Sequence, residues 1–259
     1  MVQQITPFSA AKTLLNNELF SFNSRTFSAL FGLDKFQTNN LLNRMERDGL
    51  VVRIERGKFL LLGLTPEKVL SNPLYIGSHL TTPAYVSFWS ALHFHGFTKQ
   101  VPHTVFVVTT HRKKGVTFRD MHFQFITLKP QHFFGYRREM LAELPVVIAD
   151  EAKAILDSLA LPQYAGGLAE VAKALQIATS EERLELQVMF DYVEHLQNAS
   201  LSSRLGYLLE LLGKSAEGLH PSKGPVKLDP QRSARGDFNP RWQLYVNVTQ
   251  KELFPEGVV

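Results

Sequence analysis

Apolar positions in the first 65 residues recur at helical spacing in three successive segments, which predicts three amphipathic helices. The segments open on residues that favour helix N-caps, namely Thr6, Asn23 or Ser24, and Asp34. Gly32 is suited to end the second helix, because glycine readily adopts the left-handed backbone conformation that often follows a helix. The third helix is expected to run from Asp34 to about Asp48.

Two β-rich runs follow the third helix, with a short glycine-containing turn between them. They cover residues 50–54 and 58–62, on either side of Glu55-Arg56-Gly57. This pattern is typical of a β-hairpin. Three helices followed by a hairpin predict a winged helix-turn-helix, which we assign to residues 1–65.

The remaining residues, 66–259, are expected to form a second domain, because short apolar strands precede a series of helical patterns. The expected strands cover 104–110, part of 116–128, 146–149 and 241–248. The expected helices cover a short stretch within 66–82, and then 83–94, 150–161, 166–177, 181–197 and 200–213. Residues 214–240 are expected to form a long loop. The predicted fold class is α+β: an N-terminal winged helix-turn-helix and a C-terminal mixed α/β domain with a small sheet and helices.

Composition narrows the functional classes. The chain has 259 residues, of which 44% are hydrophobic and 20% are charged, as in ordinary globular proteins. It has no cysteine, which excludes disulfides, thiolate metal sites and a cysteine nucleophile. No apolar run approaches the roughly 20 residues needed to span a bilayer, and residues 1–5 lack the features of a signal peptide. We therefore expect a cytoplasmic protein with no membrane partner.

The net charge of +4 is unevenly distributed along the chain. Basic residues exceed acidic ones in residues 1–65 and again in residues 95–145, whereas acidic residues dominate residues 146–219. Such asymmetry fits a polyanionic partner for the two basic regions. Charge alone favours solvated protein faces over such a partner, so the positions of individual side chains carry more weight.

The third predicted helix separates apolar from polar side chains clearly. Its polar face carries Asn39, Asn40, Asn43 and Arg47, with Arg44 at the edge of that face. Asparagine and arginine have the donor and acceptor geometry that suits adenine and guanine edges in the major groove. Asparagine is also a poorer helix former than the Lys, Glu and Ala common on ordinary surface helices. We therefore predict that this face reads double-stranded DNA.

Two further sets of basic residues could contact the phosphate backbone. The hairpin carries Arg53, Arg56 and Lys58, which would position the wing on phosphates or in a narrow minor groove. A second basic face could be formed by Arg112, Lys113, Lys114, Arg119, Arg137 and Arg138. That face would bind phosphate without reading sequence, and a solvated loop is an equally good interpretation of it.

Several blocks of the chain follow one another in a characteristic order and spacing, namely residues 53–59, 83–92 with Gly96, 105–109 with 112–114, 148–157 followed by 166–168, and 242–248. In this order and spacing the chain resembles the AbiEi family, the antitoxin and autorepressor half of AbiE-type toxin–antitoxin operons. The resemblance implies a repressor that binds inverted repeats in its own promoter. It also implies a C-terminal domain that counters a nucleotidyltransferase-like AbiEii toxin, without requiring a stable complex. The loop at 214–240 does not align with the family.

Two alternative functions remain open at the level of the sequence. Asp150, Glu151 and Lys153 have the spacing of a metal-dependent nuclease, although they open a predicted helix, where Asp150 would serve as an N-cap. A protein-only interaction module is the second alternative. Seven histidines lie between residues 79 and 132, but none forms an i, i+4 pair with a carboxylate on a helix. We therefore expect no enzyme activity, no bound metal and no cofactor.

Overall fold

The computed structural model describes residues 5–63, 65–255 and 257. Its first unit, residues 5–63, contains the three helices and the hairpin expected from the sequence. An additional short strand lies between the first two helices and completes a three-stranded antiparallel sheet of order β1-β3-β2. The elements are α1 (Pro7–Asn16), β1 (Ser21–Asn23), α2 (Ser24–Phe31), α3 (Lys35–Arg47), β2 (Val51–Glu55) and β3 (Lys58–Leu61).

Stacked aromatic rings form the centre of this N-terminal unit. Phe22 lies between Phe27 and Phe59, with ring centroids 5.6 and 5.8 Å away. These rings come from β1, α2 and β3, so they join the helices to the sheet. Leu42 and Met45 are buried on the inner side of α3. The apolar spacing of the sequence thus places one face of α3 in the core, as predicted.

The chain then enters a six-stranded mixed sheet of order β6-β7-β5-β4-β9-β8. Strands β5 and β7 are parallel, as are β4 and β9, and the other neighbours are antiparallel. The strands are β4 (Ala84–Val86), β5 (Thr104–Thr109), β6 (Val116–Phe118), β7 (Met121–Thr127), β8 (Tyr136–Leu141) and β9 (Leu144–Ala149). The helices before and within this region are α4 (Pro66–Leu70), α5 (Pro73–His79) and α6 (Phe88–Phe94), with a short 3-10 turn, η1, at Pro130–His132.

The helix predicted over residues 83–94 is wrong in its first half. Residues 84–86 form the central strand β4, and only Phe88–Phe94 is helical. Tyr85 and Val86 are fully buried, because β4 pairs with β5 on one side and β9 on the other. A strand buried on both faces has no alternating pattern, so its few apolar residues can be mistaken for a helix face.

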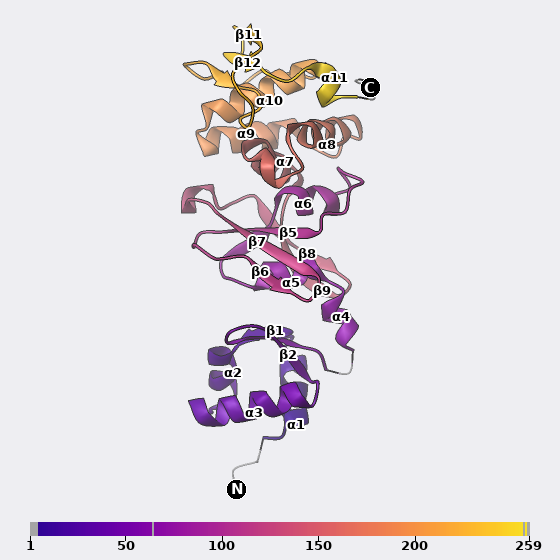
Figure 1. Ribbon diagram of the computed structural model, residues 1–259, viewed down its shortest axis with the longest axis vertical. Coiled ribbons are helices and arrows are strands. Elements are labelled where there is room, and N and C mark those ends of the chain that lie inside the picture. Colours follow the sequence, from indigo (N-terminus) through magenta and orange to yellow (C-terminus); the bar gives the residue numbers. More distant parts are fainter. Residues whose placement is uncertain (1–4, 64, 256, 258–259) are drawn as a thin grey trace.

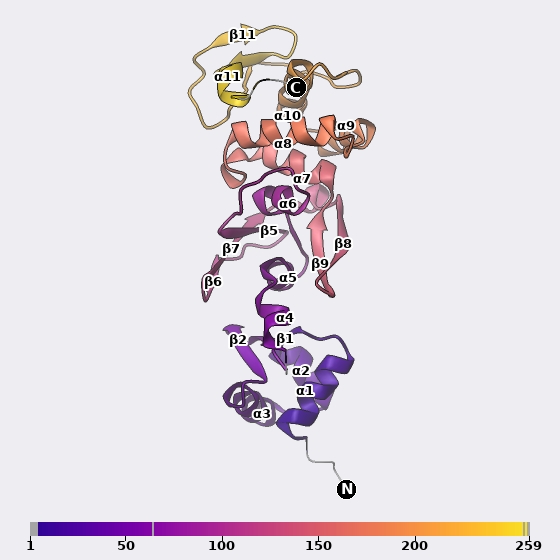
Figure 2. The same ribbon diagram turned by 90° about the vertical axis from the view of Figure 1, so that its right-hand side faces the viewer.

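Helices cover the sheet and continue beyond it. Figures 1 and 2 show α5 on one face of the sheet and α6 on the other, with α7 beyond α6. The packing of α5 is close: a Cβ on Gly77 would lie 2.9 Å from a methyl group of Val105. The later helices are α7 (Glu151–Ala160), α8 (Leu168–Ser180), α9 (Leu186–Leu196), α10 (Ala199–Leu211) and α11 (Gln250–Leu253), with η2 (Pro162–Tyr164) before α8.

The expected loop over residues 214–240 is interrupted by two short strands. With the strand expected near the end of the chain they make a third sheet, in which β10 (Val226–Lys227) and β11 (Asp237–Asn239) flank β12 (Leu244–Val246). This sheet is held on α10 by Trp242, whose ring packs directly against Gly206. A Cβ on Gly206 would lie only 2.2 Å from the ring, so a larger residue does not fit there. The Trp242 indole N–H donates to Glu210 at 2.8 Å.

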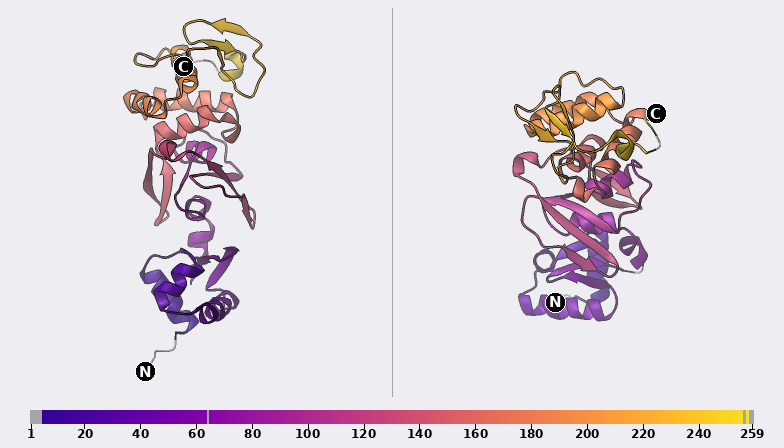
Figure 3. Two further views of the ribbon diagram at one scale, coloured as in Figure 1. Left: turned by 90° about the vertical axis from the view of Figure 1, so that its left-hand side faces the viewer. Right: turned by 45° about the horizontal axis from the view of Figure 1, so that its top comes forward.

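The molecule is elongated, and its parts follow one another along its length. Figure 3 (left) shows α1–α3 at one end, the six-stranded sheet in the middle, and α10 with the third sheet at the other end. Helix α3 lies on the far side of the N-terminal unit from the six-stranded sheet (Figure 1). None of the helices within the described residues is long and apolar enough to cross a membrane.

Candidate nucleic-acid interface

Helix α3 is fixed at its start by its own sequence. Asp34 accepts a hydrogen bond from the Gln37 backbone N–H at 2.8 Å, and the Gln37 side chain accepts one from the Asp34 backbone N–H at 3.1 Å. This reciprocal capping box satisfies two donors at the helix terminus. Gly32, with a positive φ of 62°, ends α2 and makes the turn between the two helices. The sequence thus builds a short α2–turn–α3 connection whose second helix has a defined start.

The outer face of α3 matches the predicted recognition face. Asn39, Asn40, Asn43, Arg44 and Arg47 are all exposed. The opposite face is buried and consists of Thr38, Leu41, Leu42 and Met45. The five polar side chains therefore form one continuous surface of about two helical turns, which points away from the core.

Arg53 belongs to the same surface, although it comes from strand β2. Its guanidinium donates to Asn43 Oδ1 at 3.5 Å and to Glu46 Oε2 at 3.4 Å. It also lies 5.2 Å from the centre of the Phe59 ring, a distance suited to a cation–π contact. Arg53 therefore joins the hairpin to α3 and orients the Asn43 amide.

The other two hairpin cations lie differently. Arg56 is exposed at the turn, next to Gly57, whose carbonyl accepts a hydrogen bond from the Ser24 N–H at 2.9 Å. Lys58 is turned toward the second part of the chain, where it donates to the carbonyl of Leu80 and pairs with Glu55 at 3.0 Å. Of the predicted wing residues, Arg53 and Arg56 are exposed and Lys58 is engaged at the junction.

A cation from the predicted second basic face also contributes to the junction between the N-terminal unit and the part of the chain that carries the six-stranded sheet. Lys113 Nζ contacts both carboxylate oxygens of Glu55 at 2.8 Å. Burial opposes ionisation of Glu55, but the hydrogen bonds from Lys113 and Lys58 outweigh it and lower the pKa of that carboxyl. Lys113 thus ties the hairpin tip to the loop that follows β5. A separate contact is made by Lys68, which pairs with Glu143 in the turn between β8 and β9 at 2.8 Å and lies over the Phe20 ring of the N-terminal unit.

The remaining members of the second basic face do not share one environment. Arg137 pairs with Glu139 and makes a two-pronged contact with Glu151 at 2.6 and 2.8 Å. Arg119 packs over the Phe118 ring at the turn between β6 and β7. Arg112 and Lys114, in the loop after β5, are exposed. Arg138, next to Arg137 on β8, is exposed as well. The predicted set is therefore spread over two loops and the edge strand β8.

Asp150, Glu151 and Lys153 turn toward separate partners. Asp150 caps α7 by accepting from the Lys153 N–H at 2.8 Å and also accepts from the Tyr192 hydroxyl at 2.7 Å. Hydrogen bonds from Arg137 hold the pKa of Glu151 at about 2. Lys153 is fully buried and contacts Asp157 and the Tyr85 hydroxyl. In the described part of the chain, no three His, Asp or Glu side chains are grouped as metal ligands would be.

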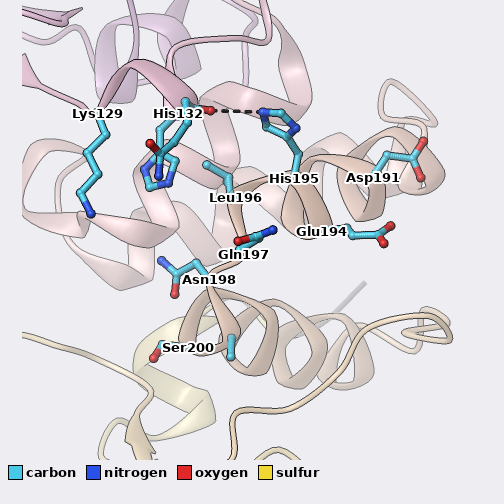
Figure 4. A pocket seen from close by; sticks show the side chains of 11 residues that line it. Lys129, His132, Asp191, Glu194, His195, Leu196, Gln197, Asn198 and Ser200 are labelled. Carbon is cyan, nitrogen blue, oxygen red and sulfur yellow. Dashed lines mark hydrogen bonds between the residues drawn. The ribbon is translucent and has the colours of Figure 1, made fainter.

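A cleft of about 870 Å³ lies between the η1 turn and the start of α10. Figure 4 shows its lining: Lys129 and His132 on one side, and His195, Glu194 and Asp191 from α9 on the other. His195 is held by the carbonyl of Gln131 at 3.1 Å. The lining carries both basic and acidic groups, so it selects no single ligand charge.

The fold has a counterpart among solved structures. No protein-family model matches the chain, and no curated protein does. The chain is similar to the crystal structure of the RV2827C protein from Mycobacterium tuberculosis, with a TM-score of 0.59 and 13% sequence identity. The match covers 93% of this chain and 92% of that one. At this identity the likeness shows a shared α+β fold along nearly the whole length.

Sequence analysis missed one prominent residue of the α3 surface. Phe36 has 75% of its side chain exposed, the largest fraction among the exposed large hydrophobic residues described. At 100° per residue, it lies within about 20° of Asn43 and Arg47 around the helix. The same wheel could have found it, since the exposed polar face is centred on an aromatic residue.

Proposed function

We propose that the chain is a DNA-binding autorepressor and the antitoxin of an AbiE-type toxin–antitoxin operon. In this proposal residues 5–63 act as a winged helix that binds inverted repeats in the chain's own promoter. The observation that carries the proposal is the exposed face of α3, where three asparagines and two arginines lie together. These side chains suit base edges and phosphates, and the element that bears them is capped and packed on the core.

Position supports the same interpretation. Helix α3 lies at one end of the elongated molecule, on the side away from the six-stranded sheet (Figure 2). A duplex can approach such a helix along its length. Residues toward the N-terminus of a recognition helix contact base edges, whereas residues near its C-terminal end lie closer to the backbone. We therefore assign Asn39, Asn40 and Asn43 to base contacts, and Arg44 and Arg47 to guanine or phosphate near the groove edge.

The antitoxin part of the proposal rests on the AbiEi-like blocks of the sequence. They extend through the six-stranded sheet and α7 to the last strand. In this proposal, residues 66–259 counter a nucleotidyltransferase-like toxin and have no catalytic role of their own. The contacts of Asp150, Glu151 and Lys153 favour structural roles for these residues, since each is engaged by a different partner.

The test is a gel shift on the DNA immediately upstream of the gene, in buffer without divalent metal. The wild type should give a specific shift. Asn43→Ala/Arg47→Ala should weaken specific binding by about 100-fold, because each well-placed base contact is worth about 1–3 kcal/mol. Arg235→Ala, in the loop before β11 at the opposite end of the molecule, serves as the control and should bind like the wild type.

The alternatives give different results in the same experiment. No specific shift by the wild type at low salt, where phosphate contacts are strongest, would refute the repressor proposal. Equal loss of binding in the Arg235→Ala control would show that nonspecific charge attraction had been measured. Cleavage of the DNA on addition of Mg²⁺ would instead favour the nuclease alternative.

A further inference from the structure

We propose that Phe36 reads the C5 methyl group of thymine in the operator. This inference rests on the proposed DNA-binding function and adds the base feature recognised by one side chain. In the major groove, thymine presents a methyl group that cytosine, adenine and guanine lack. Phenylalanine is among the side chains that contact this methyl group. A nonpolar side chain on a base-reading face thus has a specific apolar target.

The placement of Phe36 carries the inference. It is the second residue of α3, within the first helical turn, where a recognition helix contacts base edges. Its side chain is 75% exposed and takes no part in the hydrophobic core of the N-terminal unit. Asn39 and Asn40 follow three and four positions later, so they are its neighbours on the helix surface. The aromatic ring therefore lies among the groups assigned to base contacts.

Charge around Phe36 also favours DNA over an apolar protein partner. The exposed surface of α3 carries Lys35, Arg44 and Arg47, and Arg53 from β2 adds a further cation. Of the acidic residues along α3, Glu46 is engaged by Arg53, whereas Asp34 caps the start of the helix and Asp48 lies at its end. A single aromatic residue among amides and cations suits DNA, which is a polyanion with isolated methyl groups in its major groove. A protein groove that binds a helix would instead require a stripe of apolar side chains along α3.

Replacing thymine by uracil tests the contact without changing base pairing. The upstream promoter fragment is amplified once with dTTP and once with dUTP, and the affinity of each product is measured by gel shift. The wild type should bind the thymine fragment about three- to tenfold more tightly for each thymine contacted, which corresponds to burial of one methyl group. Phe36→Ala should lose this preference, apart from the slight effect of uracil on DNA shape. Phe36→Leu, which retains an apolar side chain, should recover part of the preference.

Phe8→Ala is the matched control, because Phe8 is also a phenylalanine near a helix start and is 62% exposed, but on α1. It should keep the preference of the wild type for thymine. Uracil also alters DNA shape slightly, and the comparison of Phe36→Ala with the wild type on both fragments removes that effect, because shape acts on both proteins.

Failure of this inference is distinguishable from failure of the proposed function. If the wild type binds neither fragment specifically, the repressor proposal falls and this inference with it. If the wild type binds both fragments specifically and equally, the repressor stands and the thymine contact is refuted. A Phe36→Ala protein that keeps the full preference for thymine would also refute the contact.

Discussion

Lys153 and Asp157 provide the sharpest test of the packing between the six-stranded sheet and α7. The two residues lie one turn apart on α7, with side chains 0% and 6% exposed. Lys153 Nζ also contacts the Tyr85 hydroxyl at 3.0 Å, and Asp157 accepts from Tyr85 and from Ser87 at 3.1 and 2.8 Å. Tyr85 lies in β4, and Ser87 directly follows that strand. This buried group of side chains therefore connects the sheet to α7.

Replacing Asp157 by Asn should destabilise the protein by about 3–5 kcal/mol, because it leaves the charge of Lys153 buried without a counter-ion. The amide oxygen of Asn can still accept from Tyr85 and Ser87, but its NH2 group then faces Lys153 Nζ, so the hydrogen bond from Lys153 is lost together with the counter-ion. In a domain of this size, such a loss corresponds to a fall in melting temperature of about 10 °C. The double variant Lys153→Met/Asp157→Asn buries no charge and should recover most of the stability.

Urea unfolding followed by circular dichroism measures the free energy of unfolding of each protein. The wild type, Lys153→Met, Asp157→Asn and the double variant form a double-mutant cycle. We expect the double variant to be more stable than Asp157→Asn alone. The reasoning is refuted if the effects of the two substitutions simply add, or if Asp157→Asn costs less than about 1 kcal/mol. Either result would mean that water or structural relaxation compensates the buried ammonium.

Two further predictions concern carboxylates with lowered pKa values. Glu55→Gln removes the ion pairs to Lys113 and Lys58. Because these pairs are partly exposed, the tip of the β2–β3 hairpin should lose about 1 kcal/mol or less of local stability, and its amide hydrogens should exchange faster. The pKa of Glu151 is held at about 2, so its ion pair stabilises the protein fully above the ordinary value of 4.5 and is lost as pH falls toward 2. Glu151→Gln should therefore reduce the loss of thermal stability between pH 5 and pH 2, whereas Glu217→Gln, at an exposed position, should not.

The N-terminal unit was the most predictable part of the fold. Its helices have local start signals, such as the Asp34–Gln37 capping box, and local stop signals, such as Gly32. The exposed polar face of α3 follows from helical periodicity alone, and the structure places all five predicted side chains outward. Short-range signals suffice here because each element is specified within its own sequence.

Long-range pairing accounts for what the sequence did not reveal. Strand β8 (Tyr136–Leu141) was not expected, because it contains Arg137, Arg138 and Glu139 and has no apolar alternation. It is an edge strand, and its charged residues are tolerated where one side remains open. Strand β1 was likewise missed, since its three residues gain their structure only by pairing with β3. Neither partner can be identified from local pattern.

The same limit applies to the basic residues. The sequence predicts Lys58 as a wing contact to DNA and leaves Lys113 open between a phosphate-binding face and a solvated loop. In the structure both pair with Glu55, which is distant from Lys113 in sequence. Only the folded chain shows that an acidic residue near the hairpin turn neutralises them. Phe36 represents the opposite case, because its place on the exposed face of α3 follows from the helical wheel alone.

These contacts separate two roles within the predicted basic residues. Lys58 and Lys113 hold the hairpin tip against the loop after β5, so they fix how the N-terminal unit sits on the six-stranded sheet. Arg44 and Arg47 lie on the outer side of α3, where no acidic partner is recorded among the described residues. A residue that binds phosphate contributes to the salt dependence of DNA affinity, and a residue engaged within the protein does not. Substituting Arg44 or Arg47 should therefore lower the salt slope of operator binding by about one each, while substituting Lys113 should leave that slope unchanged.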